Sequence, residues 1–269
     1  MTAIMAGLGH RVTRVDALGG VENHVHRVRG PGLDAVLRTP VDPACADTYP
    51  LEAWAIGAAR AAGVPSPPVL ALGERVLVLE YWAPQGELTD PWRRLGALAA
   101  AVARIPLDSA PDALFSRFGR DLPAAWRAHV RYNVAALTPD DPLLGAYPAA
   151  DRERLRELIA PLAFAPFAHG LAHGDLAPRN LIPRAAAPAL IDWGAASTGP
   201  APWTELQRVY QEQPPDALAA FAVGAGVTLD SDILALLHRL TVLRSLDLAR
   251  WAREHRPDLA PAYAARIVT

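Results

Sequence analysis

Residues 173–194 read HGDLAPRNLIPRAAAPALIDWG. Asp175, Asn180 and Asp192 stand here among apolar residues and prolines. An unpaired buried carboxylate is costly, so it normally takes up a proton, pairs with a cation or binds a metal ion. The stretch therefore indicates a functional site whose partners lie elsewhere in the chain.

Two short apolar runs in this stretch, residues 181–182 and 189–191, are separated by the proline-flanked segment PRAAAP. If the runs pair as a β-hairpin, Asn180 and Asp192 lie side by side at one end of it. Asp175 then lies on the loop that leads into the hairpin. Three oxygen-bearing side chains would converge on one point. This suits Mg²⁺, because the ion prefers a few carboxylate or amide oxygens together with phosphate and water.

The composition indicates a globular protein. Its 269 residues suffice for one sizeable core or for two smaller lobes packed together. The formal net charge is −2 and the basic residues are scattered, so we expect no nucleic-acid partner. No apolar run reaches the roughly 18 residues of a membrane span, and the first residues lack the pattern of a secretory signal. The single cysteine, Cys45, excludes an internal disulfide. We expect a cytoplasmic protein without a membrane partner.

All basic side chains other than histidine are arginines, and the sequence contains no lysine. Mechanisms that need a lysine amine are therefore excluded. These include a Schiff base and the GxxxxGK[ST] phosphate loop.

The first 82 residues predict a small, mostly antiparallel sheet that carries one helix. Valine-rich runs and glycine pairs predict strands over residues 11–18, 23–29 and 33–39, and RVLVLEYW predicts another over 75–82 after the extended PSPPVLAL. A helix is predicted from a cap at Asp47 or Thr48 to Gly63, with Pro50 in its first turn.

After a linker over residues 83–90 the pattern changes to helical periodicity. The clearest helical stretches are residues 92–105, 122–137, 150–163 and 231–255. Strands first and helices later predict an α+β protein of two lobes and not an alternating, doubly wound sheet. We expect an N-terminal lobe over residues 1–82 and a mainly helical C-terminal lobe over residues 83–269.

HGDLAPRN followed by IDWG resembles the catalytic loop and metal-binding motif of the aminoglycoside phosphotransferase and choline kinase group, small-molecule relatives of the protein kinases. Protein kinases carry a catalytic-loop aspartate, an asparagine beyond it and a metal-binding aspartate in this order. The resemblance implies a protein-kinase-like two-lobe fold. It also implies that Asp175 is the base that orients the acceptor hydroxyl, and that Asn180 and Asp192 hold Mg²⁺ on the phosphates of ATP or GTP.

The resemblance extends upstream to the residues that would bind the phosphates. It places Gly20 and Asn23 in the turn over the phosphates, and it places Arg38, in AVLR, where the family usually has a lysine. Glu52 is the only acid of the predicted helix over residues 51–62, so it is the natural partner of Arg38.

The resemblance also covers the binding of the base. Glu80 and Trp82, in VLEYW, occupy the hinge positions whose backbone carbonyl and amide bind the base of the nucleotide. The matches run in order over about residues 16–195. The implied N-terminal lobe binds the nucleotide, and the implied C-terminal lobe carries the catalytic loop and the acceptor site.

The chain departs from the family pattern at three places. Arg38 is larger and more forked than the usual lysine, so it can grip two phosphate oxygens. Glu22 stands where many relatives have a serine. GPAPWTELQ, residues 199–207, replaces the common GDPxxDLA, so we expect Trp203 or Glu205 to support the metal-binding loop.

Two residues near the motif have an ordinary structural interpretation. His173 is expected to hydrogen-bond to the loop backbone and not to act as a catalyst. For Arg179 two roles stay open: it steadies Asp175 or contacts the acceptor, or it forms a surface salt bridge.

These features predict an ATP- or GTP-dependent phosphotransferase that acts on a hydroxyl of a small molecule. Residues 195–269 hold eight acids and seven arginines, whereas a site for a polycationic aminoglycoside needs concentrated acid. We therefore expect an antibiotic or a sugar-like metabolite of low or negative charge as acceptor, with an aminoglycoside as a further option.

Two alternatives from other classes stay open. A nucleotide-binding pseudokinase that regulates a partner is suggested by the missing lysine and by Glu22. A metal-dependent phosphoesterase is suggested by His169, His173, Asp175 and Asp192 as ligands, and it predicts a bound transition metal without nucleotide dependence.

Overall fold

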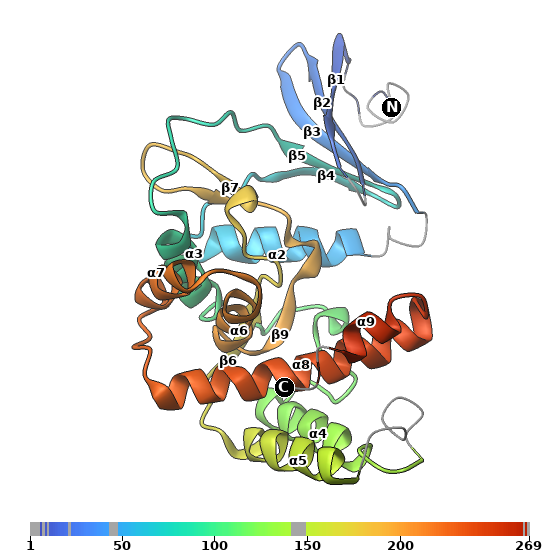
Figure 1. Cartoon of the computed structure of the whole chain (residues 1–269). Coiled ribbons are helices and arrows are strands. Elements are labelled where there is room, and N and C mark those ends of the chain that lie inside the picture. The colour runs from blue at the N-terminus through green and yellow to red at the C-terminus, as the bar shows by residue number, and fades with distance from the viewer. Residues whose placement is uncertain are drawn as a thin grey trace.

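The structure, a computed structural model, describes residues 11–20, 23–42, 48–140 and 149–265, together with Ala6, Gly9 and Ile267. Figure 1 shows a twisted sheet above a mainly helical part, with helix α2 between them. This arrangement confirms the predicted α+β fold, with a small antiparallel N-terminal sheet and a mainly helical C-terminal part. The sequence positions Glu22, Cys45 and Asp47 lie outside the described residues.

A five-stranded antiparallel sheet forms the N-terminal part, in the order β1-β2-β3-β5-β4. Its strands are β1 (Arg14–Gly19), β2 (Asn23–Gly30), β3 (Leu33–Pro40), β4 (Val69–Gly73) and β5 (Val76–Glu80). Alternate residues of β3 face opposite sides of the sheet, so Ala35 and Leu37 join Val28 and Val78 in a small core on one face. The predicted strands are confirmed.

Helix α2 (Tyr49–Ala61) covers the other face of the sheet. Thr48 precedes it, Pro50 lies in its first turn and Gly63 follows its end, as the sequence predicts. Small side chains of α2, including Ala55 and Ala59, are buried in the main core.

The C-terminal part is built mainly from helices. They are α3 (Pro91–Val102), α4 (Leu122–Ala135), α5 (Ala149–Ile159), α6 (Trp203–Glu212), α7 (Pro215–Ala225), α8 (Ser231–His255) and α9 (Ala260–Ala264). The predicted helix over residues 150–163 ends early, at Ile159, and continues as a 3₁₀ turn, η3 (Ala160–Phe164). Pro161 has no backbone N–H for the α-helical ladder, which accounts for the change. None of the helices in the described ranges is long and apolar enough to cross a membrane.

Two short antiparallel strand pairs interrupt the helices. β6 (His169–Ala172) pairs with β9 (Ser197–Pro200), and β7 (Leu181–Ile182) pairs with β8 (Ala189–Leu190). The second pair is the hairpin that the sequence predicts.

One buried hydrogen-bond cluster ties the hairpin to the N-terminal part. The hydroxyl of Ser66, which precedes β4, donates to the carbonyl of Leu190 at 2.8 Å, and the indole of Trp193 donates to Ser66 Oγ at 3.2 Å. The backbone N–H of Leu190 donates to the carbonyl of Pro65 at 2.8 Å. Ser66 and Trp193 are fully buried. The cluster therefore fixes the site-bearing hairpin against the sheet.

Helices α3 and α7 approach so closely that each needs a glycine at the contact. A Cβ on Gly96 of α3 would lie 2.0 Å from the carbonyl oxygen of Phe221, and a Cβ on Gly224 of α7 would lie 1.9 Å from that of Arg93. No real side chain tolerates such distances to backbone. The pair therefore sets the spacing of the two helices.

We predict that Gly96→Ala lowers the free energy of unfolding by about 1–3 kcal/mol, because the added methyl group forces the two backbones apart. The matched control is Gly57→Ala, since Gly57 is an exposed position of α2 with no atom within 4 Å of an added Cβ. The control should stabilise the chain by roughly 0.4–1 kcal/mol. Urea unfolding measures both; equal effects of the two substitutions would contradict the close approach of α3 and α7.

Candidate active site

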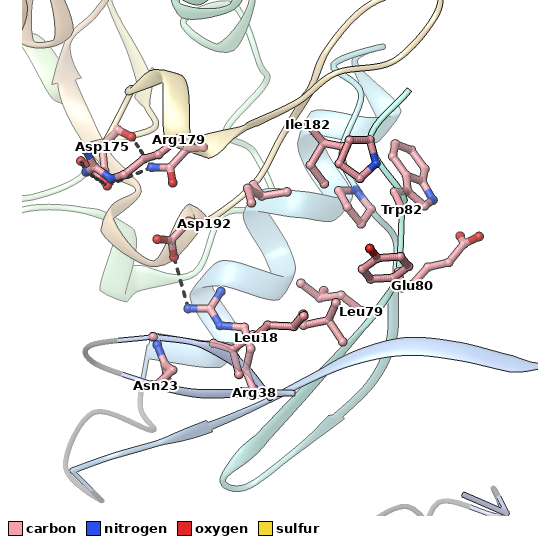
Figure 2. A pocket seen from close by; sticks show the side chains of 18 residues that line it. Leu18, Asn23, Arg38, Leu79, Glu80, Trp82, Asp175, Arg179, Ile182 and Asp192 are labelled. Atoms are coloured by element: carbon pink, nitrogen blue, oxygen red, sulfur yellow. Dashed lines mark hydrogen bonds and ion pairs between the residues drawn. The ribbon is translucent and has the colours of Figure 1, made fainter. Parts of the chain in front are cut away.

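A cleft of about 630 Å³ opens between the sheet and the helical part. Figure 2 shows the side chains that line it, with Arg38 and Asn23 on the sheet side and Asp175 and Asp192 opposite. The structure brings these predicted site residues together in the cleft: Gly20, Asn23, Arg38, Glu80, Trp82, Asp175, Asn180 and Asp192. Glu52 is fully buried directly behind Arg38.

The hairpin β7–β8 places Asn180 and Asp192 at the same end, as predicted. Leu181 lies opposite Leu190, and one step further the backbone N–H of Ile191 donates to the carbonyl of Asn180 at 3.0 Å. Asp192 has φ 68°, a left-handed conformation that is uncommon for a residue with a side chain. Such backbone strain concentrates at functional sites.

Asp175 is held by hydrogen bonds from two residues and by a third, longer ion pair. Arg179 contacts both carboxylate oxygens at 2.8 Å, Asn180 Nδ2 donates to Oδ2 at 2.9 Å, and Arg208 of α6 lies 3.6 Å from Oδ1. Burial alone would raise the pKa of Asp175, but the bonds from Arg179 and Asn180 outweigh it and lower that pKa below its usual value. Asp175 is therefore a carboxylate at neutral pH, ready to accept a hydrogen bond.

His173 positions the loop and is completely buried. Its Nε2 lies 3.0 Å from the carbonyl oxygen of Ile191, and its Nδ1 accepts from the backbone N–H of Asp175 at 3.2 Å. Because one nitrogen must donate and the other accept, the ring is the neutral Nε2–H tautomer. Burial lowers the pKa of His173 to about 4. The expected contact with the loop backbone is thus present.

Glu205 of α6 supports the same loop, whereas the sequence predicts support for the metal-binding loop from this position. Its Oε1 accepts from the backbone N–H of Gly174 at 2.7 Å. Gly174 has φ +84°, and a Cβ there would lie 2.0 Å from the carbonyl oxygen of Ala195, so only glycine fits. The alternative support, Trp203, packs instead beside Phe167 with ring centroids 6.0 Å apart.

Arg38 joins three elements around the cleft. Its Nη1 donates to Glu52 of α2, and its Nη2 donates to Asp192 Oδ1 at 3.2 Å. Burial opposes the charge of Arg38, but the Glu52 and Asp192 carboxylates together raise its pKa above the ordinary value. The sequence predicts the contact with Glu52 but not the contact with Asp192. The second contact uses the fork that an arginine has and a lysine lacks.

At the end of strand β5, the backbone carbonyl of Glu80 has no hydrogen-bond partner in the neighbouring strand. The N–H of Glu80 donates to the carbonyl of Pro68 at 3.0 Å, and the N–H of Tyr81 donates to the carbonyl of Asp34 at 3.0 Å. Ala35 of β3 lies opposite Glu80 on one side, and Pro68 lies opposite it on the β4 side, toward which the Glu80 N–H and carbonyl both point. Pro68 has no N–H to return to the Glu80 carbonyl. This carbonyl is available to a ligand in the cleft, as the hinge assignment of Glu80 requires.

Apolar side chains form both walls of the cleft near the hinge. Val25, Val36 and Leu79 come from the sheet, and Ile182 and Ile191 come from the hairpin. At the mouth, the guanidinium of Arg184 lies 4.6 Å from the centre of the Trp82 ring. The walls form a slot suited to a flat, aromatic group.

The ligand set of a phosphoesterase is not assembled. Within the described part of the chain, no three His, Cys, Asp or Glu side chains are grouped so that they could hold a metal ion. His173 is used by the loop backbone, and His169 lies on β6 beside a separate small cavity lined by Trp126 and Phe164. The suggestion of a histidine-rich metal centre is therefore wrong.

A model of the phosphotransferase enzyme family matches residues 15–231. The chain belongs to this family. Among solved structures, this phosphotransferase is similar to the macrolide 2'-phosphotransferase MphH from Brachybacterium faecium, with 19% identity, a TM-score of 0.73, and 99% of this chain and 96% of that chain covered. It is also similar to the GDP and kanamycin complex of APH(2")-IIia (16% identity, TM-score 0.66, 99% and 95% covered). No curated protein sequence matches it.

A choline/ethanolamine kinase family protein from Mesorhizobium loti is similar as well, with 20% identity, a TM-score of 0.63, and 99% of this chain and 92% of that chain covered. The three structures share the fold of this phosphotransferase. The family resemblance of the motif and the two-lobe fold are thereby confirmed.

We predict that His173 makes stability depend on pH between about 6.5 and 4. The folded state keeps its ring neutral down to about pH 4, whereas the unfolded chain takes up a proton near 6.5. The contribution of the neutral His173 ring to the free energy of unfolding is therefore fully present above about pH 6.5 and is lost as the pH falls. The loss is about 2 kcal/mol between pH 7.5 and pH 5.

Urea unfolding of the wild type and of His173→Gln at several pH values checks this. In His173→Gln the free energy of unfolding should lose this dependence on pH. His24→Gln, which replaces an exposed histidine of β2, should keep it. An unchanged slope in His173→Gln would show that the ring is not held neutral.

Proposed function

We propose that this chain transfers the γ-phosphate of ATP or GTP to a hydroxyl group of a small molecule, an antibiotic or a sugar-like metabolite. The observation that carries the proposal is the ionised Asp175 in one cleft with Asp192 and Arg38. In this proposal residues 1–82 bind the nucleotide, and residues 83–269 supply the catalytic loop and the acceptor site. The expected cytoplasmic location would provide the nucleotide.

The nucleotide would lie along the cleft from the hinge to the catalytic loop. Its base fits the apolar slot, where the carbonyl of Glu80 accepts from the base and the amide of Trp82 donates to it. Its phosphates extend toward Arg38, whose guanidinium forms directed hydrogen bonds with phosphate oxygens. Gly20 and Asn23 cover the phosphates from the sheet side. Similar structures include a complex with GDP and kanamycin and a complex with streptomycin and ATP.

Asn180 and Asp192 fit a magnesium ion by their donor atoms. Asn180 donates through Nδ2 to the backbone carbonyl and carboxylate of Asp175, at 2.7 and 2.9 Å, so its Oδ1 is the atom left for a metal. The side chain of Asp192 is 49% exposed at the cleft. When bound, Mg²⁺ would neutralise charge on the nucleotide phosphates. Arg38 would hold the Asp192 carboxylate in place before the ion arrives.

Asp175 would act on the acceptor. Its carboxylate accepts a hydrogen bond from the acceptor hydroxyl, which turns the hydroxyl oxygen toward the γ-phosphate, and it receives the proton late in the transfer. His173 and Glu205 keep the loop in place through its backbone. Phosphoryl transfer depends mainly on such positioning and on charge neutralisation.

We predict that Asp175→Asn lowers kcat by about 10²–10⁴ and leaves the affinity for the nucleotide nearly unchanged, because the amide is isosteric but cannot take the proton. The measurement is ADP or GDP release with a panel of hydroxylated antibiotics and sugars, together with nucleotide titration calorimetry. Asp112→Asn, at an exposed position of the helical part, is the control and should keep full activity.

Full activity of Asp175→Asn would remove Asp175 from the mechanism. Nucleotide binding by the wild type without transfer to any acceptor would instead identify the chain as a pseudokinase.

A further inference from the structure

Two arginines lie on the helical side of Asp175, away from the sheet. Arg208 of α6 lies 3.6 Å from Asp175 Oδ1. Arg244 of α8 lies against the same helix, because its Nη1 donates to Gln207 Oε1, next to Arg208, at 3.4 Å. Burial, followed by the charge of Arg208, lowers the pKa of Arg244. Helices α6 and α8 hold this pair together, because Gln207 of α6 donates to Thr241 of α8 at 3.0 Å.

Three acids lie near this pair: Asp175, Glu205 and Glu212. Glu205 is 3% exposed and its carboxylate accepts from the Gly174 backbone. Glu212 lies 3.4 Å from Arg244 Nη2, where the contact is long and partly exposed. Burial, with Arg208 second, lowers the pKa of Arg244 below the usual arginine value even with Glu212 present. The contacts to Asp175 and Glu212, at 3.6 and 3.4 Å, are longer than usual charge-assisted hydrogen bonds, so both guanidinium groups keep N–H donors for a ligand.

A hydroxyl group on the same face of α6 adds a second binding feature. Thr204 lies four residues before Arg208, so the two side chains are neighbours along the helix. Thr204 Oγ1 is buried, and no hydrogen-bond partner for it is found among the described residues. A buried hydroxyl without a partner is unfavourable, and a bound ligand would provide one.

We propose that the acceptor carries an anionic group, a carboxylate or a phosphate, next to its reactive hydroxyl, and that Arg208 and Arg244 bind this group. The inference rests on the proposed phosphotransfer and names the chemical class of its acceptor. With its hydroxyl on Asp175, a molecule of sugar size places its substituents beside Arg208. An anion there gains charge-assisted hydrogen bonds, whereas a polycation meets two like charges.

The test compares acceptors that share one scaffold and differ in charge: glucose, glucuronate, glucose 6-phosphate and glucosamine. Equilibrium binding is measured by calorimetry with the nucleotide analogue present, and transfer is measured by ADP or GDP release. We expect glucuronate or glucose 6-phosphate to bind about tenfold or more tightly than glucose, and glucosamine to bind more weakly than glucose. If glucuronate binds more tightly than glucose 6-phosphate, the anionic group is a carboxylate, and the reverse order indicates a phosphate.

The variant Arg244→Gln separates recognition from catalysis. It should raise the KM for the acidic acceptor about tenfold or more, change its kcat less than about threefold, and leave the KM for glucose unchanged. Arg253→Gln, at an exposed position of the same helix, is the matched control and should change none of these values. This split would not follow from a general loss of structure, which would affect neutral and acidic acceptors alike.

Equal binding of the neutral and acidic acceptors, or tighter binding of glucosamine than of glucose, overturns the inference. Transfer of phosphate to any of these acceptors would still support the proposed function. Binding of the nucleotide without transfer to any acceptor overturns the proposed function, and the inference with it. The inference is supported if an acidic acceptor binds more tightly than glucose and Arg244→Gln abolishes this difference in affinity.

Discussion

The ion pair of Arg38 with Glu52, extended to Asp192, is the interaction on which the cleft depends. Arg38 is 9% exposed and Glu52 is fully buried, and charges at such depth are tolerated only when they are paired. The sheet, α2 and the hairpin loop therefore share one arginine. Removing Arg38 would leave the Glu52 carboxylate buried without its cation, so the pair constrains how the sheet sits on the rest of the molecule.

The loop that carries Asp175 is held by a second set of contacts, which His173 also joins to the hairpin through the carbonyl of Ile191. His173 and Glu205 bind backbone groups of the loop, and neither of them enters the cleft lining. Asp175 is thus positioned through its own backbone while its carboxylate stays partly exposed between Arg179 and Arg208. In the proposed function, Arg38 lies on the phosphate side of the site and Asp175 on the acceptor side. The nucleotide and the acceptor would then be recognised by different residues.

Much of the fold and part of the site could be predicted from local patterns. The hairpin follows from short-range spacing, and Glu52 as the partner of Arg38 follows from the scarcity of other acids in its helix. Glu205 supports the loop that carries Asp175 and not the metal-binding loop, where the sequence placed its role. The approach of Arg208 to Asp175 could not be predicted, because it depends on the packing of α6, which is distant in sequence. The free carbonyl of Glu80 depends on the strand register that puts Pro68 opposite it. Such long-range relations leave no local signal.

The proposed metal site is tested by the binding of Mn²⁺, a paramagnetic substitute for Mg²⁺, followed by electron paramagnetic resonance with and without a non-hydrolysable nucleotide. We expect Mn²⁺ to bind firmly only when the nucleotide is present, because Asn180 and Asp192 supply too few ligands without phosphate oxygens. We also expect Asp192→Asn to weaken this binding about tenfold or more. Firm binding of Mn²⁺ without the nucleotide, or binding that Asp192→Asn does not change, would contradict a metal site formed by these two residues and the phosphates.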